Sequence, residues 1–433
     1  MRTLRFPGPF SKSEFRMRCK FFMTKRSCFG PIAFLAAVAV LGVSIALVAK
    51  SISPEVQEIS LPGSPFAVAV APHGRYVFAS LSGATNGIAV IEQGRRFASF
   101  VGVLPTGGPT FGLAVTSDGR YLLDTVQPLG LPATQGVQFI DLHRAVAGEA
   151  NAILGTVPTA PGSAPIEVVL SNDNHFVFVS NEGNATVTVI DFNLALASGE
   201  NASSIVGNIP VELAPVGLAV SPDDRRLYVT NELANPTDPG YNPAACTGAA
   251  GTTPKGTLTV VDLLRAESDP ATSVLSSVYA GCSPVRVALS EDGGVAWVTA
   301  RAENHLLAFS TRKLLRDPSD ALLSRTPVGT APVGIQLFDH DHFIAVANSN
   351  RFTPGQIGTV SILDYAKALR GAGASATVGT FSAGLFPRQW ALSDDDRFLY
   401  LTEFSSNVLA IFPVRPLIRQ VEPSHPWPAS REE

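Results

Sequence analysis

The chain has 433 residues, 45% of them hydrophobic, and a formal net charge of −4, so it holds enough apolar sequence to bury a large core. Residues 1–50 carry nine Lys and Arg residues and one acidic residue, which leaves 23 basic and 35 acidic residues for the rest of the chain. An acidic folded part without a basic stripe argues against nucleic acid as a partner.

A basic segment followed by an apolar run opens the chain. The apolar run lies within residues 31–49, and eight of the nine basic residues precede it. This pattern predicts a signal peptide or a membrane anchor, and hence a protein of the periplasm, the cell surface or the medium. The run is long for a signal peptide and short for a membrane span, and Ala49-Lys50-Ser51 fits a cleavage site, so cleavage and retention in a membrane both stay open. Met23 is an alternative start, and a buried N-terminal helix of a cytosolic protein is the third interpretation.

One sequence repeat occurs seven times within residues 51–413. It consists of an apolar strand, an acidic or Gly-containing turn, a second strand, a loop and a third strand. Bulky and small side chains alternate along the first strand, which is typical of β-structure. Self-similarity at this spacing predicts a β-propeller. The first strands begin at or near Pro65, Phe111, Pro165, Pro215, Pro284, Pro332 and Pro387.

Fourth strands are expected at only six places, although the repeat occurs seven times. The segment Glu55–Leu61 precedes the first repeat, and we expect it to pair with residues 407–413 as the missing strand, because closing the ring covers two sheet edges. The sequence therefore predicts an all-β, seven-bladed propeller of four-stranded blades, followed by a Pro-rich tail over residues 414–433 that should fray. The six expected fourth strands lie near residues 97–103, 152–157, 203–211, 273–279, 324–328 and 376–381.

The fourth repeat carries the sharpest likeness to a known family. It reads PVGLAVSPDDRRLYVTNE from Pro215 to Glu232, then GTLTVVD, and the third repeat contains SNEGNATVTVID from Ser180 to Asp191. The chain resembles the YVTN-repeat propellers, which are often grouped with seven-bladed lactonase-like propellers, and the resemblance extends over all seven repeats. It implies a seven-bladed propeller outside the cytoplasm.

The family is functionally mixed, so the resemblance leaves two functions open. The first is a non-catalytic, monomeric module that binds a protein, a glycan or a small molecule without a cofactor. The alternative is a lactonase-like hydrolase at the mouth of the central channel, which would use a carboxylate base and a divalent cation.

One position of the first strand is occupied by a small residue in some repeats and by a polar residue in others. It is Gly in blades 2, 4 and 6, and it is Glu167, Arg286 and Gln389 in blades 3, 5 and 7. Loops that enter the same end of the propeller carry further polar side chains. These residues predict a ligand site, or alternatively pairs that hold blades together. The candidate ligand-binding residues are Glu167, Arg286, Gln389, Asn231, Arg301 and Arg351.

The turns at the opposite end are rich in Asp. We interpret them as turn chemistry, in which Asp side chains accept hydrogen bonds from nearby backbone N–H groups. His340 and His342 flank Asp341, a spacing that suits a metal, but zinc needs three or four converging ligands. We therefore predict no metal site.

Cys246 and Cys282 are the only cysteines after residue 28. Cys246 lies in the long loop of the fourth blade, over 233–255, and Cys282 lies in the connection that enters the fifth blade. Both segments belong to the same end of the propeller, so we predict a disulfide between them. A loop of this length is either functional or mobile, and its composition does not decide which.

Overall fold

The computed structural model describes residues 55–127, 135–248 and 251–424. These residues belong to the second of the two units into which the chain divides, Ile52–Glu433. The predicted signal peptide or anchor lies outside the described residues. Among the helices of the described ranges, none is long and apolar enough to cross a membrane.

The described residues of the second unit form seven antiparallel four-stranded sheets and one two-stranded hairpin. The sheets are arranged around a common axis, because the innermost strand of each sheet contacts the innermost strands of the sheets before and after it, and β28 contacts β2. The protein is a seven-bladed β-propeller, as predicted. Blades 1 to 7 begin with the innermost strands β2 (Ser64–Val70), β6 (Thr110–Val115), β10 (Pro165–Leu170), β14 (Leu213–Val220), β20 (Pro284–Leu289), β24 (Pro332–Phe338) and β28 (Pro387–Leu392).

Each blade continues outward through three more strands. The second strands are β3 (Tyr76–Ser82), β7 (Tyr121–Val126), β11 (Phe176–Asn181), β15 (Arg226–Leu233), β21 (Val295–Ala300), β25 (Phe343–Asn348) and β29 (Phe398–Glu403). The third strands are β4 (Gly87–Gln93), β8 (Gly136–Asp141), β12 (Thr186–Asp191), β18 (Thr257–Asp262), β22 (His305–Ser310), β26 (Ile357–Asp364) and β30 (Val408–Pro413). The outer strands of blades 1 to 6 are β5 (Ala98–Leu104), β9 (Ile153–Pro158), β13 (Ile205–Pro210), β19 (Val274–Tyr279), β23 (Leu322–Pro327) and β27 (Thr377–Leu385).

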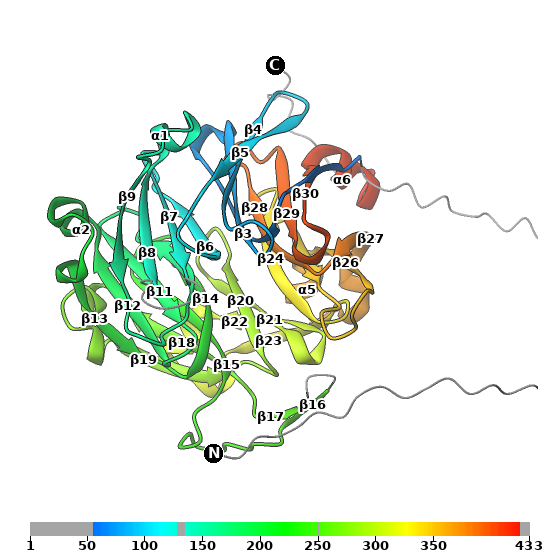
Figure 1. Cartoon of the computed structure of the whole chain (residues 1–433). Helices are drawn as coiled ribbons and strands as arrows, with labels where there is room; N and C mark the ends of the chain where they lie inside the picture. The colour runs from blue at the N-terminus through cyan, green and yellow to red at the C-terminus, as the bar shows by residue number, and fades with distance from the viewer. Residues whose placement is uncertain (1–54, 128–134, 249–250, 425–433) are drawn as a thin grey trace, which may run out of the picture. The chain divides into compact units, whose positions relative to one another are not determined.

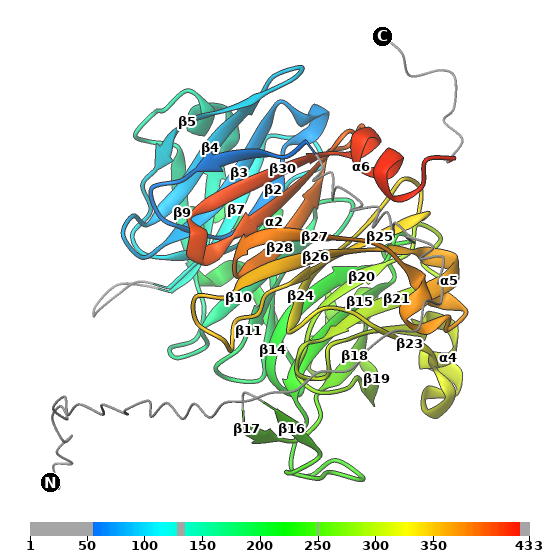
Figure 2. The same cartoon turned by 90° about the vertical axis from the view of Figure 1, so that its right-hand side faces the viewer.

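The outer strand of blade 7 comes from the N-terminal end of the described chain. Strand β1 (Gln57–Ser60) pairs antiparallel with β30, with Gln57 opposite Ile411 and Ser60 opposite Val408. Figure 2 shows this dark blue strand beside the red β30. Ile59 and Leu61 pack in a cluster with Val77 of blade 1. The predicted closure of the ring is therefore confirmed.

Short helices follow the third strands and were not predicted. Asp191 shows why they form: its side chain accepts a hydrogen bond from the backbone N–H of Leu194 at 2.8 Å and so caps the helix N-terminus. Asp or Ser residues cap four other helices in the same way. The helices are α1 (Leu142–Val146), α2 (Phe192–Ser198), α3 (Leu263–Ala266), α4 (Thr311–Arg316), α5 (Tyr365–Leu369) and α6 (Val414–Val421), with 3₁₀ turns η1 (Pro72–Gly74), η2 (Ala202–Ser204), η3 (Pro270–Thr272), η4 (Arg301–Glu303), η5 (Pro318–Asp320), η6 (Gly373–Ala376) and η7 (Phe404–Ser406).

The expected fraying of the C-terminal tail is wrong for its first eight residues. They form α6, whose Val414, Leu417 and Ile418 are buried in the core cluster of blades 6 and 7. Apolar residues spaced three and four apart give this segment one face that can be buried.

A hydroxyl group joins neighbouring blades at six of the seven junctions. In blade 2, Thr125 Oγ1 accepts the N–H of Gly112 at 2.8 Å and donates to the carbonyl of Ile166 in blade 3 at 3.0 Å. Blade 6 has Ala347 at this position, which carries no hydroxyl. The hydroxyls belong to Ser80, Thr125, Ser180, Thr230, Thr299 and Thr402.

The acidic turns behave as expected. Ser221 donates to Asp223 at 2.6 Å, and the same Asp carboxylate accepts the backbone N–H of Arg225. Hydrogen bonds of this kind, led by that from Ser221, lower the pKa of Asp223. The Ser or Thr to Asp bond recurs in blades 2, 3, 5 and 7, so the turn-chemistry interpretation is confirmed.

Candidate functional site

Three predicted residues meet across the central channel. Arg286 Nη2 lies 3.0 Å from Glu167 Oε2, and Gln389 Nε2 donates to Glu167 Oε1 at 3.3 Å. Arg286 Nη2 also donates to Gln389 Oε1 at 3.4 Å. Blades 3, 5 and 7 are not neighbours in the ring, so these side chains must span its centre. We call Glu167, Arg286 and Gln389 the channel floor.

Glycine at the same position of the intervening blades allows the strands to approach. A Cβ atom on Gly217 would lie 2.5 Å from the Val285 carbonyl and 3.0 Å from Arg286 Cα. The blade 4 backbone can therefore pack this closely on the strand that carries Arg286 only without a side chain. Burial raises the pKa of Glu167, and the nearby charge of Arg286 opposes that rise.

A second layer lies one residue before the floor in each innermost strand. Blades 1 and 2 place Phe66 and Phe111 there, with ring centroids 4.8 Å apart, and blades 3 to 6 place Ile or Val residues. Blade 7 instead places Arg388, whose Cζ lies 3.3 Å from the Phe66 ring centroid and 5.5 Å from that of Phe386. This layer is thus apolar except for one guanidinium group.

Charged side chains that follow or end the second strands of blades 3 to 6 surround this layer. Arg301 in η4 pairs with Glu232 at the end of β15, with 2.6 Å between Nη2 and Oε2. Arg351, which follows β25, lies 5.1 Å from the Phe386 ring centroid. Partial desolvation by the surrounding side chains, followed by the charge of Arg301, lowers the pKa of Arg351. Glu182, which follows β11, has a pKa raised by partial desolvation and then by Glu232.

We call Glu182, Glu232, Arg301, Arg351 and Arg388 the channel mouth. Electrostatic interactions connect all five, since Glu182 interacts with Glu232 and with each of the three arginines. Burial lowers the pKa of Arg388 well below its usual value, and the charges of Arg286, Arg351 and Arg301 add to that effect. The channel mouth therefore brings three arginine side chains together beside aromatic rings.

One predicted residue does not join this group. Asn231 is fully buried in blade 4, where its side-chain amide donates to Thr257 and Thr259 Oγ1, each at 3.0 Å. Asn181 and Asn348 make the same pairs of bonds in blades 3 and 6. These asparagines therefore link the second and third strands of a blade.

The sequence pattern did not identify the aromatic residues of the mouth. Phe386 and Phe404 have ring centroids 5.4 Å apart, and Phe404 lies 6.3 Å from Phe66. A signal was present, because blades 1 and 2 have Phe where blades 3 to 6 have Ile or Val, and blade 7 has Arg388.

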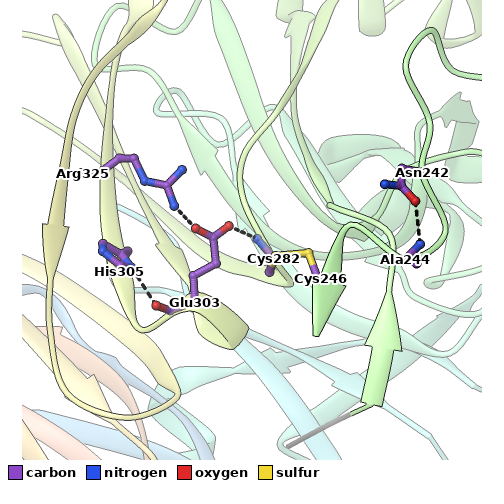
Figure 3. Close-up of a disulfide and its surroundings, with 7 residues drawn as sticks. All are labelled: Asn242, Ala244, Cys246, Cys282, Glu303, His305 and Arg325. Atoms are coloured by element: carbon purple, nitrogen blue, oxygen red, sulfur yellow. Dashed lines mark hydrogen bonds and ion pairs between the residues drawn. A yellow bond between two sulfur atoms is a disulfide. The ribbon is translucent and has the colours of Figure 1, made fainter. Parts of the chain in front are cut away.

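The predicted disulfide is confirmed. Cys246 and Cys282 are bonded, with Cα atoms 5.7 Å apart and a sequence separation of 36 (Figure 3). The bond tethers a hairpin of β16 (Cys246–Gly248) and β17 (Gly251–Thr253), which projects from the ring in Figures 1 and 2. Glu303 of η4 accepts the N–H of Cys282 at 2.5 Å and pairs with Arg325. The long loop of blade 4 is thus fixed beside the element that carries Arg301.

The opposite end of the channel holds a cavity of about 530 Å³. It is lined mainly by innermost strands and turns of blades 2 and 3, and it reaches Glu167. Most lining side chains are small or aliphatic, for example Ala114 and Val169, so this end offers fewer charged groups than the mouth.

No group of three or more His, Cys, Asp or Glu residues within residues 55–127, 135–248 and 251–424 is arranged to hold a metal ion. His340 Nδ1 contacts Glu291 Oε1 at 3.2 Å, and His342 Nδ1 contacts the Asp339 carbonyl at 2.6 Å. The two histidines therefore have partners in the turns, and the absence of a metal in this protein stays a prediction.

Comparison with known proteins supports the fold and goes no further. No family model matches the chain, and no curated protein matches it. Among solved structures, a chain of hydrazine synthase from Kuenenia stuttgartiensis has a TM-score of 0.61 at 17% identity, covering 82% of this chain and 96% of its own length. The Cps50 (Swd1) β-propeller domain from Myceliophteria thermophila has a TM-score of 0.57 at 13% identity, covering 83% and 99%. At these identities the similarity establishes a β-propeller fold alone.

Proposed function

We propose that this protein is an extracytoplasmic propeller of the YVTN-repeat type that binds a ligand at the channel mouth and performs no chemistry. The observation that carries the proposal is the convergence of Arg301, Arg351 and Arg388 from three consecutive blades. Arg301 and Arg351 both lie over the ring of Phe352, and Arg351 and Arg388 both lie over the ring of Phe386. The channel floor lies directly beneath them. Binding residues concentrate on loops that a rigid scaffold positions, and this end holds such loops.

Two features support a location outside the cytoplasm. The basic and apolar segment of residues 1–50 has the composition of an export signal. The bond between Cys246 and Cys282 is of a kind that persists in oxidising compartments. Cell fractionation with a thiol-labelling reagent tests this part: both cysteines should resist labelling in protein isolated from the periplasm, the surface or the medium.

A thermal-shift screen of sugars, peptides, organic acids and lactones tests the binding proposal. Compounds that raise the Tm should lose their effect in Arg351→Ala, which alters an exposed mouth residue. They should keep it in Arg120→Ala, an exposed arginine of the other end whose guanidinium also lies over an aromatic ring, that of Tyr121. Hits that are insensitive to Arg351 and sensitive to Ala114→Leu, in the opposite cavity, would overturn the proposal.

The lactonase-like function is the second candidate, and Glu182 favours it. A carboxyl group whose pKa is raised, beside three arginines that could stabilise an oxyanion, has the properties of a general base. Lactone hydrolysis by the purified protein, abolished in Glu182→Gln and unchanged in Arg120→Ala, would establish this function in place of simple binding.

A further inference from the structure

Arg388 is a buried cation without an anionic partner of its own. Its exposed fraction is 9%. Within the described part of the chain, no hydrogen bond or ion pair is formed by its side chain, and its Nε is buried and unpartnered. Its guanidinium lies over the rings of Phe66 and Phe386, and it interacts electrostatically with Glu167 and Glu182 without an ion pair to either.

The acidic groups nearby are already engaged. Glu167 is bonded to Arg286 and Gln389 in the channel floor. Glu232 is bonded to Arg301, so Glu182 remains as the acidic counterpart of both Arg351 and Arg388. The mouth and floor together thus contain four arginines and three glutamates, with the unbalanced positive charge at the buried position.

A buried arginine in this situation is costly to the free protein. Removing a guanidinium from water carries a penalty that a cation–π contact only partly offsets. Such a residue is retained where something else supplies the anion, and planar oxyanions bind a guanidinium through two parallel hydrogen bonds. The neighbouring rings of Phe386 and Phe404 are only partly buried and can contact the apolar body of the same molecule.

We propose that the channel mouth binds a small molecule that carries a carboxylate or another oxyanion on an apolar or aromatic body, with Arg388 as the anchor of the anionic group. This inference rests on the proposed binding function and specifies its ligand class. Arg351, which is exposed and shares the Phe386 ring, contributes the second positive charge.

The test uses benzoate, phenyl phosphate and the uncharged analogue benzamide as probes, titrated calorimetrically at constant ionic strength. Benzoate or phenyl phosphate should bind the parent protein at least about tenfold more tightly than benzamide, because a charge-assisted hydrogen bond is lost in the amide. Arg388→Gln should weaken the anion by at least about tenfold, and Arg120→Gln should leave it unchanged. Preference for phenyl phosphate over benzoate would identify the oxyanion.

A second measurement needs no ligand. Arg388→Met keeps an unbranched side chain of similar length without the charge, so in anion-free buffer its Tm should be higher than that of the parent by about 2 °C or more. A lower Tm for Arg388→Met would mean that the contact with Phe66 is what retains the arginine, and would overturn the inference.

The outcomes separate this inference from the proposed function. If benzoate and phenyl phosphate bind no better than benzamide, or bind equally well to Arg388→Gln, the anion inference is wrong. The binding function would still stand if an uncharged compound from the screen depended on Arg351. If no compound depended on residues of the mouth, both would fail.

Discussion

The hydroxyl group between neighbouring blades gives a sharp prediction for stability. Thr125 is fully buried, accepts a hydrogen bond from Gly112 and donates one to Ile166 of the next blade. Thr125→Val keeps the side-chain shape, so no cavity forms, but both buried backbone groups lose their partner. Each buried unsatisfied group costs about 1–3 kcal/mol, so the free energy of unfolding should fall by about 2–4 kcal/mol.

Blade 6 allows the reverse experiment. Ala347→Ser introduces the hydroxyl at the junction that lacks it, and Ser already serves this purpose in blades 1 and 3. The spacing suits it: a Cβ on Gly334 would lie 2.5 Å from the Arg388 carbonyl, as one on Gly112 would lie from that of Ile166. The free energy of unfolding should rise by about 0.5–1.5 kcal/mol.

Urea unfolding followed by tryptophan fluorescence measures both changes. Thr252→Val, at an exposed position of the β16–β17 hairpin, is the control for loss of a hydroxyl and should shift the midpoint little. The reasoning would be refuted if Thr125→Val unfolded at the same urea concentration as Thr252→Val.

Three further predictions concern closure, the floor and a buried carboxyl. Deleting residues 55–61 should leave β30 as an open edge, and light scattering should show aggregation at temperatures where the full chain stays in solution; an equally soluble deletion variant would disprove the closure. Arg286→Ala leaves Glu167 buried without its ion pair, so the free energy of unfolding measured in urea should fall by about 3 kcal/mol. An unchanged free energy of unfolding would mean that the channel floor does not stabilise the protein. Burial raises the pKa of Asp124 well above 3.8, so stability should fall as pH rises from 3.8 towards the folded-state pKa. Asp124→Asn should equal the parent near pH 3.8 and exceed it at pH 7, and a pH-independent difference would contradict this.

The propeller could be predicted from sequence because its signals are local and repeated. Alternating side chains reveal each strand, and the count of fourth strands assigns Glu55–Leu61 to the last blade. The short helices were not predicted because a segment of four to eight residues is too short to show a helical period. Asp191 and the equivalent residues of other blades are nevertheless residue types that commonly cap a helix N-terminus.

The site could be predicted only in part, because its contacts join distant blades. The alternation of Gly with Glu167, Arg286 and Gln389 placed three polar residues at one level of the channel, but their mutual pairing depends on three non-adjacent blades facing one axis. Asn231 was assigned to the ligand site because it was expected in the loop after the second strand of blade 4. In the structure β15 continues to Leu233, and the Asn231 side chain bonds within its own blade.

A crystal structure of the propeller soaked with 4-bromobenzoate tests the central claim most directly, because anomalous scattering from bromine locates the compound without assumptions. The account predicts bromine at the channel mouth, with the carboxylate within hydrogen-bonding distance of the Arg388 guanidinium and the ring against Phe386. Bromine in the cavity at the opposite end, or at the mouth with its carboxylate turned away from Arg388, would contradict it.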